Sequence, residues 1–285
     1  MAANILEAMT ENYSSFTRQG KKLADYIFEH AADAQYLSIS ALAENSGVSE
    51  ATITRFCRQL GLSGYNDFKL ALAKADHRTD LGDPFDSPET ISSEDSLESM
   101  FQKLHRLNVI SLNETLELLS PASISLAVSI LSDADRVYCL GSGGSMVMAM
   151  EAWARFSTAT SRFVHIADAH MQVMAASLCT QKDVILYFSY SGSTKDMEDV
   201  MEIARKQGAR IILVTHFPRS KAAGYADVVL LCGYNESPLQ SGSIAAKIGQ
   251  LFIIECLYYG FCQKNARVCS ENRTATVDAI TRKLL

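Results

Sequence analysis

The chain has 285 residues, of which 48% are hydrophobic and 20% are charged, and its net charge is −6. The length favours two domains, and the composition excludes a disordered or collagen-like chain. The charge identifies no partner, and it is less basic than is usual for a nucleic-acid-binding protein.

The hydropathy pattern predicts a cytoplasmic protein without a membrane span. No apolar run reaches the roughly 18 residues of a span, because the nearest one, over residues 248–261, is interrupted by Glu255. The N-terminus lacks a basic stretch followed by an apolar one, so no signal peptide is expected. The seven cysteines include no CxxC pair, which fits reduced thiols in a cytoplasm.

The first 78 residues show helical periodicity throughout. An apolar face predicts a helix over residues 16–30, and shorter helices are predicted over 40–45 and 50–60. Gly47 lies where the first of the two short helices should end, and Ser49 is a suitable N-cap for the next. A helix, a short glycine-containing turn and a second helix make up a helix-turn-helix.

The predicted second helix has an apolar side and a polar side. Ile53, Phe56, Cys57 and Leu60 share the side that should pack inward. The outer side carries hydroxyls and arginines, which suit base edges and phosphates. The candidate DNA-binding residues are Ser49, Glu50, Thr52, Thr54, Arg55 and Arg58. Spacing alone leaves open a solvated helix of a bundle that contacts no DNA.

Residues 41–44, 47–61, 64–65 and 67–72 form a long and specific pattern, which includes Gly-Val-Ser-Glu-Ala-Thr-Ile-Thr-Arg-Phe. This pattern resembles the N-terminal domain of the RpiR family of bacterial transcription regulators. The resemblance implies a helical bundle that contains a helix-turn-helix. It also implies that the positions of the turn and the second helix contact DNA.

An acidic segment follows. Residues 79–98 carry seven acidic side chains and no lysine or arginine, and Pro84 and Pro88 lie among them. That composition is typical of a solvated linker. We therefore expect a helix-turn-helix domain over residues 1–78, an acidic linker and connecting helix over 79–121, and a second domain over 122–285.

Helices are predicted over residues 97–119 and 124–132, and short apolar strands alternate with helices beyond them. The strands are expected at 137–140, 163–166, 184–188, 211–215 and 228–232. This alternation predicts a parallel five-stranded sheet flanked by helices on both faces. Ligands of such sheets bind beyond the carboxyl ends of the strands.

Two serine-rich loops follow two of these strands. We call Gly141-Ser142-Gly143-Gly144-Ser145 the first loop and Ser189-Tyr190-Ser191-Gly192-Ser193-Thr194 the second loop. Small residues, hydroxyls and a following helix N-terminus make each loop a candidate anion site. Neither loop contains a lysine, and Met146 replaces the third glycine of a dinucleotide fingerprint. The loops therefore predict a phosphorylated small molecule, although the first alone also fits a plain tight turn.

Both loops, with Asp168-Ala169-His170, resemble the SIS (sugar isomerase) domain, a phosphosugar-binding fold, over about residues 122–280. The resemblance implies that Ser189, Ser191 and Thr194 hold the phosphate and that Ser142 and Ser145 lie near the sugar. The full set of candidate ligand-binding residues is Ser142, Gly143, Ser145, Ser189, Ser191, Gly192, Ser193 and Thr194. A helix-turn-helix ahead of a SIS domain is the RpiR architecture.

Two positions depart from the SIS pattern. The last long helix begins with Ala246-Lys247 where family members often have Ser-Arg. Lys247 is interpreted as an ordinary surface lysine, with a ligand or subunit contact as the alternative. His216 replaces a small polar residue and is interpreted as a capping or surface histidine, with an influence on sugar choice as the alternative.

Isomerisation of a sugar phosphate requires an acid–base residue near the site. Glu255, His165, His170 and His216 are available, but no paired Glu/His motif, nucleophilic triad or metal-ligand spacing occurs. We therefore expect no catalytic residue, metal or cofactor.

The predicted protein is a transcription regulator of a carbohydrate-metabolism operon. It binds double-stranded operator DNA, responds to a sugar phosphate and forms a homodimer or homotetramer. The resemblance implies repressors and activators, repression being commoner. A phosphosugar isomerase with an accessory helical domain, and a SIS domain that serves only for oligomerisation, stay open.

Overall fold

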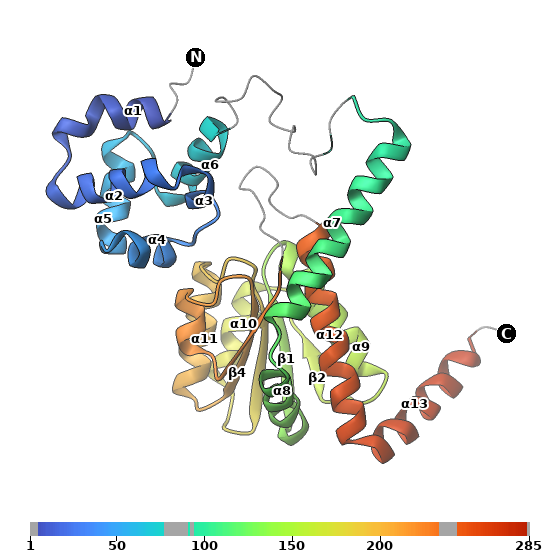
Figure 1. The fold of residues 1–285 in the computed structure, drawn as a ribbon. Helices are drawn as coiled ribbons and strands as arrows, with labels where there is room; N and C mark the ends of the chain where they lie inside the picture. The colour runs from blue at the N-terminus through green and yellow to red at the C-terminus, as the bar shows by residue number, and fades with distance from the viewer. Residues whose placement is uncertain (1–4, 77–90, 92–93, 234–243, 284–285) are drawn as a thin grey trace. The chain divides into compact units, whose positions relative to one another are not determined.

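The computed structural model describes residues 5–76, 91, 94–233 and 244–283 (Figure 1). These residues form two compact units, one up to Val109 and one from Ile110 onward. Most of the acidic segment lies outside the described residues. Within them, Asp95 is not solvated, because it pairs with Lys103 Nζ at 2.8 Å and its side chain is only 11% exposed.

The first unit is helical throughout, as predicted. Its elements are α1 (Ile5–Asn12), η1 (Tyr13–Ser15), α2 (Arg18–Glu29), α3 (Ala31–Ala34), α4 (Ile39–Ser46), α5 (Glu50–Gln59) and α6 (Tyr65–Asp76). One core joins them, in which the Phe56 ring lies 4.7 Å from the Phe16 ring and 6.0 Å from the Phe68 ring. Three helices begin at hydroxyl caps, because Thr17, Ser38 and Ser49 each accept a hydrogen bond from the backbone amide three residues on.

The second unit contains a sheet and its covering helices. The helix α7 (Leu97–Leu118) begins among residues of the first unit and ends in the second. The other helices are α8 (Pro121–Asp133), α9 (Gly144–Ser157), α10 (Ala169–Ser177), α11 (Lys195–Lys206), η2 (Lys221–Tyr225), α12 (Ile244–Lys264) and α13 (Ala266–Thr281).

The five strands are parallel, as predicted from their nearly continuous apolar character. They are β1 (Arg136–Gly141), β2 (Phe163–His165), β3 (Asp183–Phe188), β4 (Arg210–Thr215) and β5 (Val228–Leu231), in the order β2-β1-β3-β4-β5. The topology reverses at β1, which has β2 on one side and β3 on the other. Ligands of such sheets bind at this switch point.

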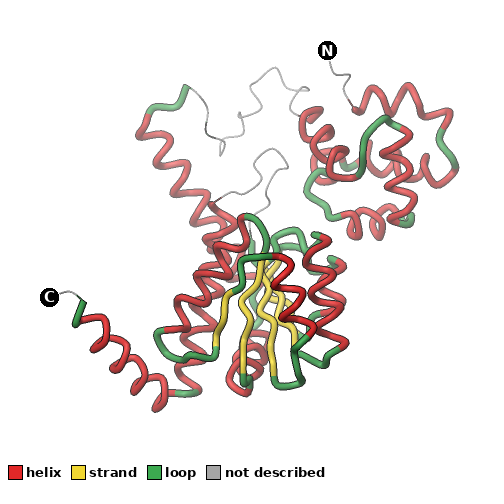
Figure 2. The backbone as a smooth tube through the Cα atoms, turned by 180° about the vertical axis from the view of Figure 1, so that it is seen from behind, coloured by secondary structure: helices red, strands yellow, loops and turns green. Residues whose placement is uncertain are grey.

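Two apolar clusters show that helices cover both faces of the sheet (Figure 2). Alternate strand residues, such as Val137 and Cys139, pack against α8, α9 and α12. Their neighbours, such as Tyr138 and Leu140, pack against α10 and α11. The strands therefore read as apolar runs because both of their faces are buried.

By length and composition, α12 is apolar enough to cross a membrane, contrary to the sequence prediction. An 18-residue window of α12 has a mean hydropathy of 1.3, since one glutamate is not enough to lower the average below a span's range. Half of that window is buried inside the structure, as in the core helix of a folded domain. Lipid is therefore not needed to explain this side of α12.

Candidate functional sites

The first and second loops lie side by side at the switch point. In the sheet register, Gly141 at the end of β1 is paired with Phe188 at the end of β3. The first loop leads directly into α9 and the second into α11. The predicted placement of both loops at one edge is therefore what the fold provides.

The first loop is closely packed against its own helix. A Cβ atom at Gly141 would come within 2.8 Å of the Ser145 carbonyl oxygen, so the turn requires glycine there. Gly143 has a φ of 56°, in the left-handed region. The Ser142 hydroxyl lies 3.3 Å from the Tyr187 hydroxyl, and burial raises the pKa of Tyr187, which keeps that phenol neutral.

The second loop holds its shape through two residues. The buried Ser189 hydroxyl accepts a hydrogen bond from the Gly192 amide at 3.2 Å, and the Ser189 amide donates to the Val214 carbonyl at 3.0 Å. Gly192 has a φ of 60°, and a Cβ atom there would collide with the Ser220 hydroxyl oxygen. Ser189 and Gly192 therefore shape the loop, whatever ligand it holds.

The rest of the second loop presents unpaired donors. Within the described part of the chain, no acceptor pairs with the backbone amides of Ser191, Ser193 or Thr194. The same holds for the hydroxyls of Ser191 and Thr194, since Thr194 is the N-cap of α11 without a side-chain capping bond. Ser193 and Thr194 are exposed and Ser191 is half-buried. Amides and hydroxyls at a helix N-terminus are an anion site.

Lys247 brings a positive charge to the first loop. A Cβ atom at Gly144 would lie 3.6 Å from Lys247 Cε and 3.7 Å from its Nζ. The lysine is half-buried on the first turns of α12, more than 100 residues further along the chain. Its position is not that of an ordinary surface lysine, because its charged end lies against the loop.

His216 supports the second loop from β4. Its Nδ1 lies 2.9 Å from the Cys232 carbonyl oxygen, so Nδ1 carries the proton, and its ring stacks on Tyr190 at 5.2 Å. Its backbone amide donates to the Tyr190 carbonyl at 3.1 Å. The interpretation as a surface histidine was wrong, since the ring is half-buried in the loop's support.

Gln172 is a residue that the sequence reasoning missed. It is buried in α10, and its Nε2 donates to the carbonyls of Gly141 at 3.0 Å and Ile166 at 2.8 Å, which fastens the ends of β1 and β2. Its Oε1 is buried without a partner among the described residues. The one available signal was a glutamine on the face of a helix that should pack against the sheet.

The acid–base candidates do not converge on the loops. The Glu255 side chain is 59% exposed and lies 3.7 Å from Arg155, in a groove between α9 and α12. His170 is exposed on the first turn of α10, and His165 Nδ1 lies 3.0 Å from the Cys139 carbonyl. Among the described residues, no three histidine, cysteine or acidic side chains gather where a metal could bind.

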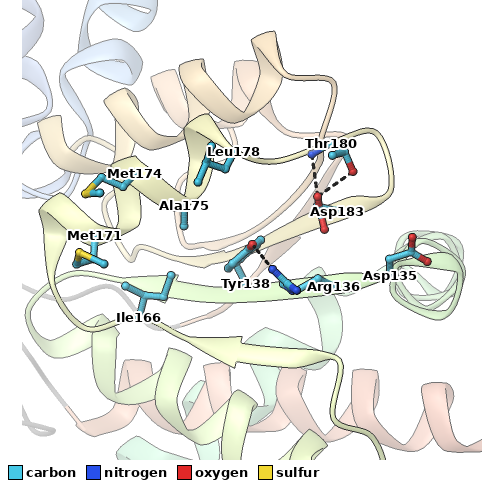
Figure 3. A pocket seen from close by; sticks show the side chains of 10 residues that line it. All are labelled: Asp135, Arg136, Tyr138, Ile166, Met171, Met174, Ala175, Leu178, Thr180 and Asp183. Atoms are coloured by element: carbon cyan, nitrogen blue, oxygen red, sulfur yellow. Dashed lines mark hydrogen bonds between the residues drawn. The ribbon is translucent and has the colours of Figure 1, made fainter.

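A second hollow, of about 500 Å³, lies between α10 and the sheet (Figure 3). Its polar groups are already paired, because Arg136 donates to the Tyr138 hydroxyl at 3.2 Å and Asp183 accepts from the Thr180 amide at 2.7 Å. Its remaining walls include Met171, Met174 and Leu178. With few polar groups free to converge on a ligand, it is a poorer candidate than the two loops.

The helix-turn-helix in the first unit is formed by α4 and α5. Gly47 ends α4 with a φ of 61°, and Ser49 begins α5. Ile53, Phe56 and Cys57 are buried, as predicted, and Leu60 is half-buried against the same core. This packing leaves the other side of α5 outside.

The structure brings the six candidate DNA-binding residues onto one helix and its cap. Ser49, Glu50, Arg55 and Arg58 are exposed, and Thr52 and Thr54 are half-buried. Some of their polar atoms are already engaged, since Ser49 Oγ lies 2.9 Å from Thr52 Oγ1 and the Thr54 hydroxyl donates to the Glu50 carbonyl. The Glu50 carboxylate accepts from the Ser40 hydroxyl at 2.5 Å, which ties α5 to α4.

Comparison with known proteins follows this two-part organisation. Residues 3–79 match the model of the helix-turn-helix domain of the rpiR family, and residues 130–259 match the SIS domain. A helix-turn-helix transcriptional regulator of Haemophilus influenzae is 31% identical over 98% of this chain and 97% of its own length. The chain belongs to the RpiR family. It is a transcriptional regulator with a helix-turn-helix domain and a SIS domain.

Solved structures agree with the family. The Vibrio vulnificus NanR protein, complexed with ManNAc-6P, superposes with a TM-score of 0.87 at 27% identity and covers 98% of both chains. A phosphoheptose isomerase from Neisseria gonorrhoeae has a TM-score of 0.52 at 14% identity and covers 59% of this chain. The isomerase likeness is limited to the fold of the second unit, whereas the regulator likeness extends over both units.

Proposed function

We propose that this RpiR-family regulator binds operator DNA through α4 and α5, and that a sugar phosphate held by the first and second loops controls this binding. The observation that carries the proposal is the row of donors in the second loop, at Ser191, Ser193 and Thr194, that have no described acceptor. Phosphate supplies the acceptors that such a row requires. The expected site of action is the cytoplasm.

The roles follow from position. The second loop and the N-terminus of α11 hold the phosphate, and Lys247 adds a positive charge beside Gly144. Ser142 and Ser145, in the first loop, contact the sugar. ManNAc-6P is the first ligand to test, because the NanR protein, which matches over nearly the whole chain, was solved in complex with it.

A buried contact offers a route from the ligand to α7. The Ser111 hydroxyl donates to the Ala245 carbonyl at 2.6 Å, two residues before Lys247. The Thr115 hydroxyl accepts from the Gly233 amide at 2.9 Å, and both side chains are fully buried. A ligand that shifts the start of α12 would therefore shift α7, which continues into residues of the first unit. Such coupling requires different affinities for the two arrangements.

A thermal-shift screen tests the effector. The full chain is heated with ManNAc-6P, with a panel of other hexose and amino-sugar phosphates, and with inorganic phosphate. A true effector raises the melting temperature in a concentration-dependent way, whereas the unphosphorylated sugar does not. If no sugar phosphate stabilises the chain, the second unit serves only for assembly.

An operator-binding assay tests the direction of control. Acting as a repressor of a carbohydrate-metabolism operon, the protein binds DNA upstream of its own or a neighbouring operon, and the effector weakens this binding. An effector that strengthens operator binding would instead identify an activator. Turnover of the same sugar phosphate by the purified protein would favour the isomerase alternative.

A further inference from the structure

The helix α12 is apolar on all sides although it has only one covered side. Ile253, Leu257 and Phe261 are buried toward the sheet, whereas Ile244 and Tyr259 are 63% and 58% exposed. A helix that is apolar all round is normally enclosed by other structure. The outer side of α12 therefore has a partner.

The chemistry of this side favours protein over lipid. Glu255 lies in the middle of α12 and pairs with Arg155 of α9, and a charged side chain at the centre of a membrane span is costly. The neighbouring surface of α9 adds Val147, Met150 and Trp153, which are 39–46% exposed. Tryptophan, tyrosine, methionine and arginine are the residues enriched in protein interfaces.

A groove of about 380 Å³ crosses this surface between α9, α12 and the end of α7. Its apolar walls are Leu112, Ile248, Leu251 and Phe252. Glu151 and Glu255 lie at its polar side together with Arg155. The groove thus suits an apolar stripe that carries a positive charge.

The helix α13 has such a stripe and little support from its own domain. Of its 16 residues only Cys269 is buried, and Figures 1 and 2 show it leading away from the sheet beyond the end of α12. One side is fastened, since the Asn272 side chain donates to the Ala159 carbonyl at 2.8 Å. An isolated helix of this length is marginal in water, so a further surface must stabilise it.

The next side of α13 is unpartnered by the described residues of its own unit. Val277 and Ile280 are 61% and 58% exposed, and Arg273 is exposed four residues before Val277. These three residues lie at helical spacing and form one stripe. Its charge is opposite to that of the two glutamates in the groove.

We propose that the outer side of α12, with α9, is the interface between two copies of this chain, and that α13 of each copy lies in the groove of the other. A two-fold axis across α12 sets the two α12 helices antiparallel. The C-terminal end of one α12, where α13 begins, then meets the N-terminal half of the other, where the groove lies. Arg273 faces Glu255, and Val277 and Ile280 fill the apolar part.

Analytical ultracentrifugation of the full chain tests the interface. The unaltered protein is a dimer, and the double substitution Val277→Asp with Ile280→Asp raises the dimer Kd about 100-fold or more, because two central apolar contacts are replaced by charges. Leu178→Asp is the matched control, since Leu178 is 78% exposed at the end of α10, outside the interface. Circular dichroism checks that all variants fold.

Charge reversal tests the occupant of the groove. Glu255→Arg and Arg273→Glu each weaken the dimer, and the two together restore it. An unaltered chain that is monomeric, a V277D/I280D protein that stays dimeric, or dissociation by L178D would overturn the proposed interface. Failure of the paired reversal to restore the dimer would overturn the seating of α13 on its partner.

Discussion

The two predicted binding surfaces use their hydroxyl groups in opposite ways. On α5, the hydroxyls of Ser49, Thr52 and Thr54 are bonded within their own helix or its cap. In the second loop, the hydroxyls of Ser191 and Thr194 have no acceptor among the described residues. The hydroxyls of α5 therefore hold the helix in place, whereas those of the loop are available to a ligand.

This difference separates the sources of affinity at the two surfaces. On α5, the exposed arginines have to supply most of the attraction to DNA phosphates and base edges. In the second loop, the fold sets out the donors before the ligand arrives, so binding costs little rearrangement. Four sets of substitutions test this contrast.

The largest effect is expected from Arg55→Ala combined with Arg58→Ala. Each arginine contributes about 1–3 kcal/mol to operator binding, so their joint loss weakens it roughly 100-fold or more. Fluorescence anisotropy with labelled operator at fixed salt measures the change. Arg18→Ala, an exposed arginine on α2, serves as the charge-matched control. Unchanged operator affinity in the double variant would remove α5 as the DNA contact.

Ser191→Ala and Ser189→Ala separate ligand binding from loop shape. Loss of either hydroxyl costs about 1–3 kcal/mol, but at different bonds. S191A weakens sugar-phosphate binding in calorimetry and leaves the melting temperature of the free protein unchanged. S189A lowers both, because its hydroxyl holds the buried Gly192 amide. Ser177→Ala, on the exposed side of α10, changes neither. Equal effects of S191A and S189A on melting would contradict the contrast.

Lys247→Met tests the charge beside the first loop. Removal of the ammonium group weakens sugar-phosphate binding about tenfold and reduces its dependence on salt, since one charge pair is lost. Lys247→Arg keeps the charge and most of the affinity. Lys182→Met, at the amino end of β3, is the control, because that side chain is 75% exposed and pairs with Asp135. Full sugar-phosphate affinity in the K247M variant would return Lys247 to a structural role.

The smallest effect is expected from Ser49→Ala. Loss of the α5 cap destabilises the first unit by about 1 kcal/mol, which urea denaturation followed by circular dichroism measures. Ser49→Asp keeps a capping oxygen and most of the stability. If S49A weakens operator binding far more than it weakens folding, the hydroxyl contacts DNA directly and the contrast between the two surfaces is too sharp.

Much of the fold was predictable because its signals are local. The apolar runs from Val137 to Leu231 mark the strands, since a parallel sheet buries both faces of each strand. Gly47 and Ser49 mark the turn between α4 and α5 because only certain residues end and begin helices. The places of the two loops after β1 and β3 followed from the same patterns.

The roles within the site depend on contacts between distant parts of the chain. Lys247 lies beside Gly144, and Gln172 holds the end of β1, because helices from elsewhere in the sequence pack against the sheet. Ser189 and Ser191 look alike in the sequence, yet only the first is turned into the loop. The sequence by itself determined the two domains and the two candidate surfaces through local periodicity. Tertiary packing alone decided which polar groups are paired, because partners far apart in the sequence meet only in the folded chain.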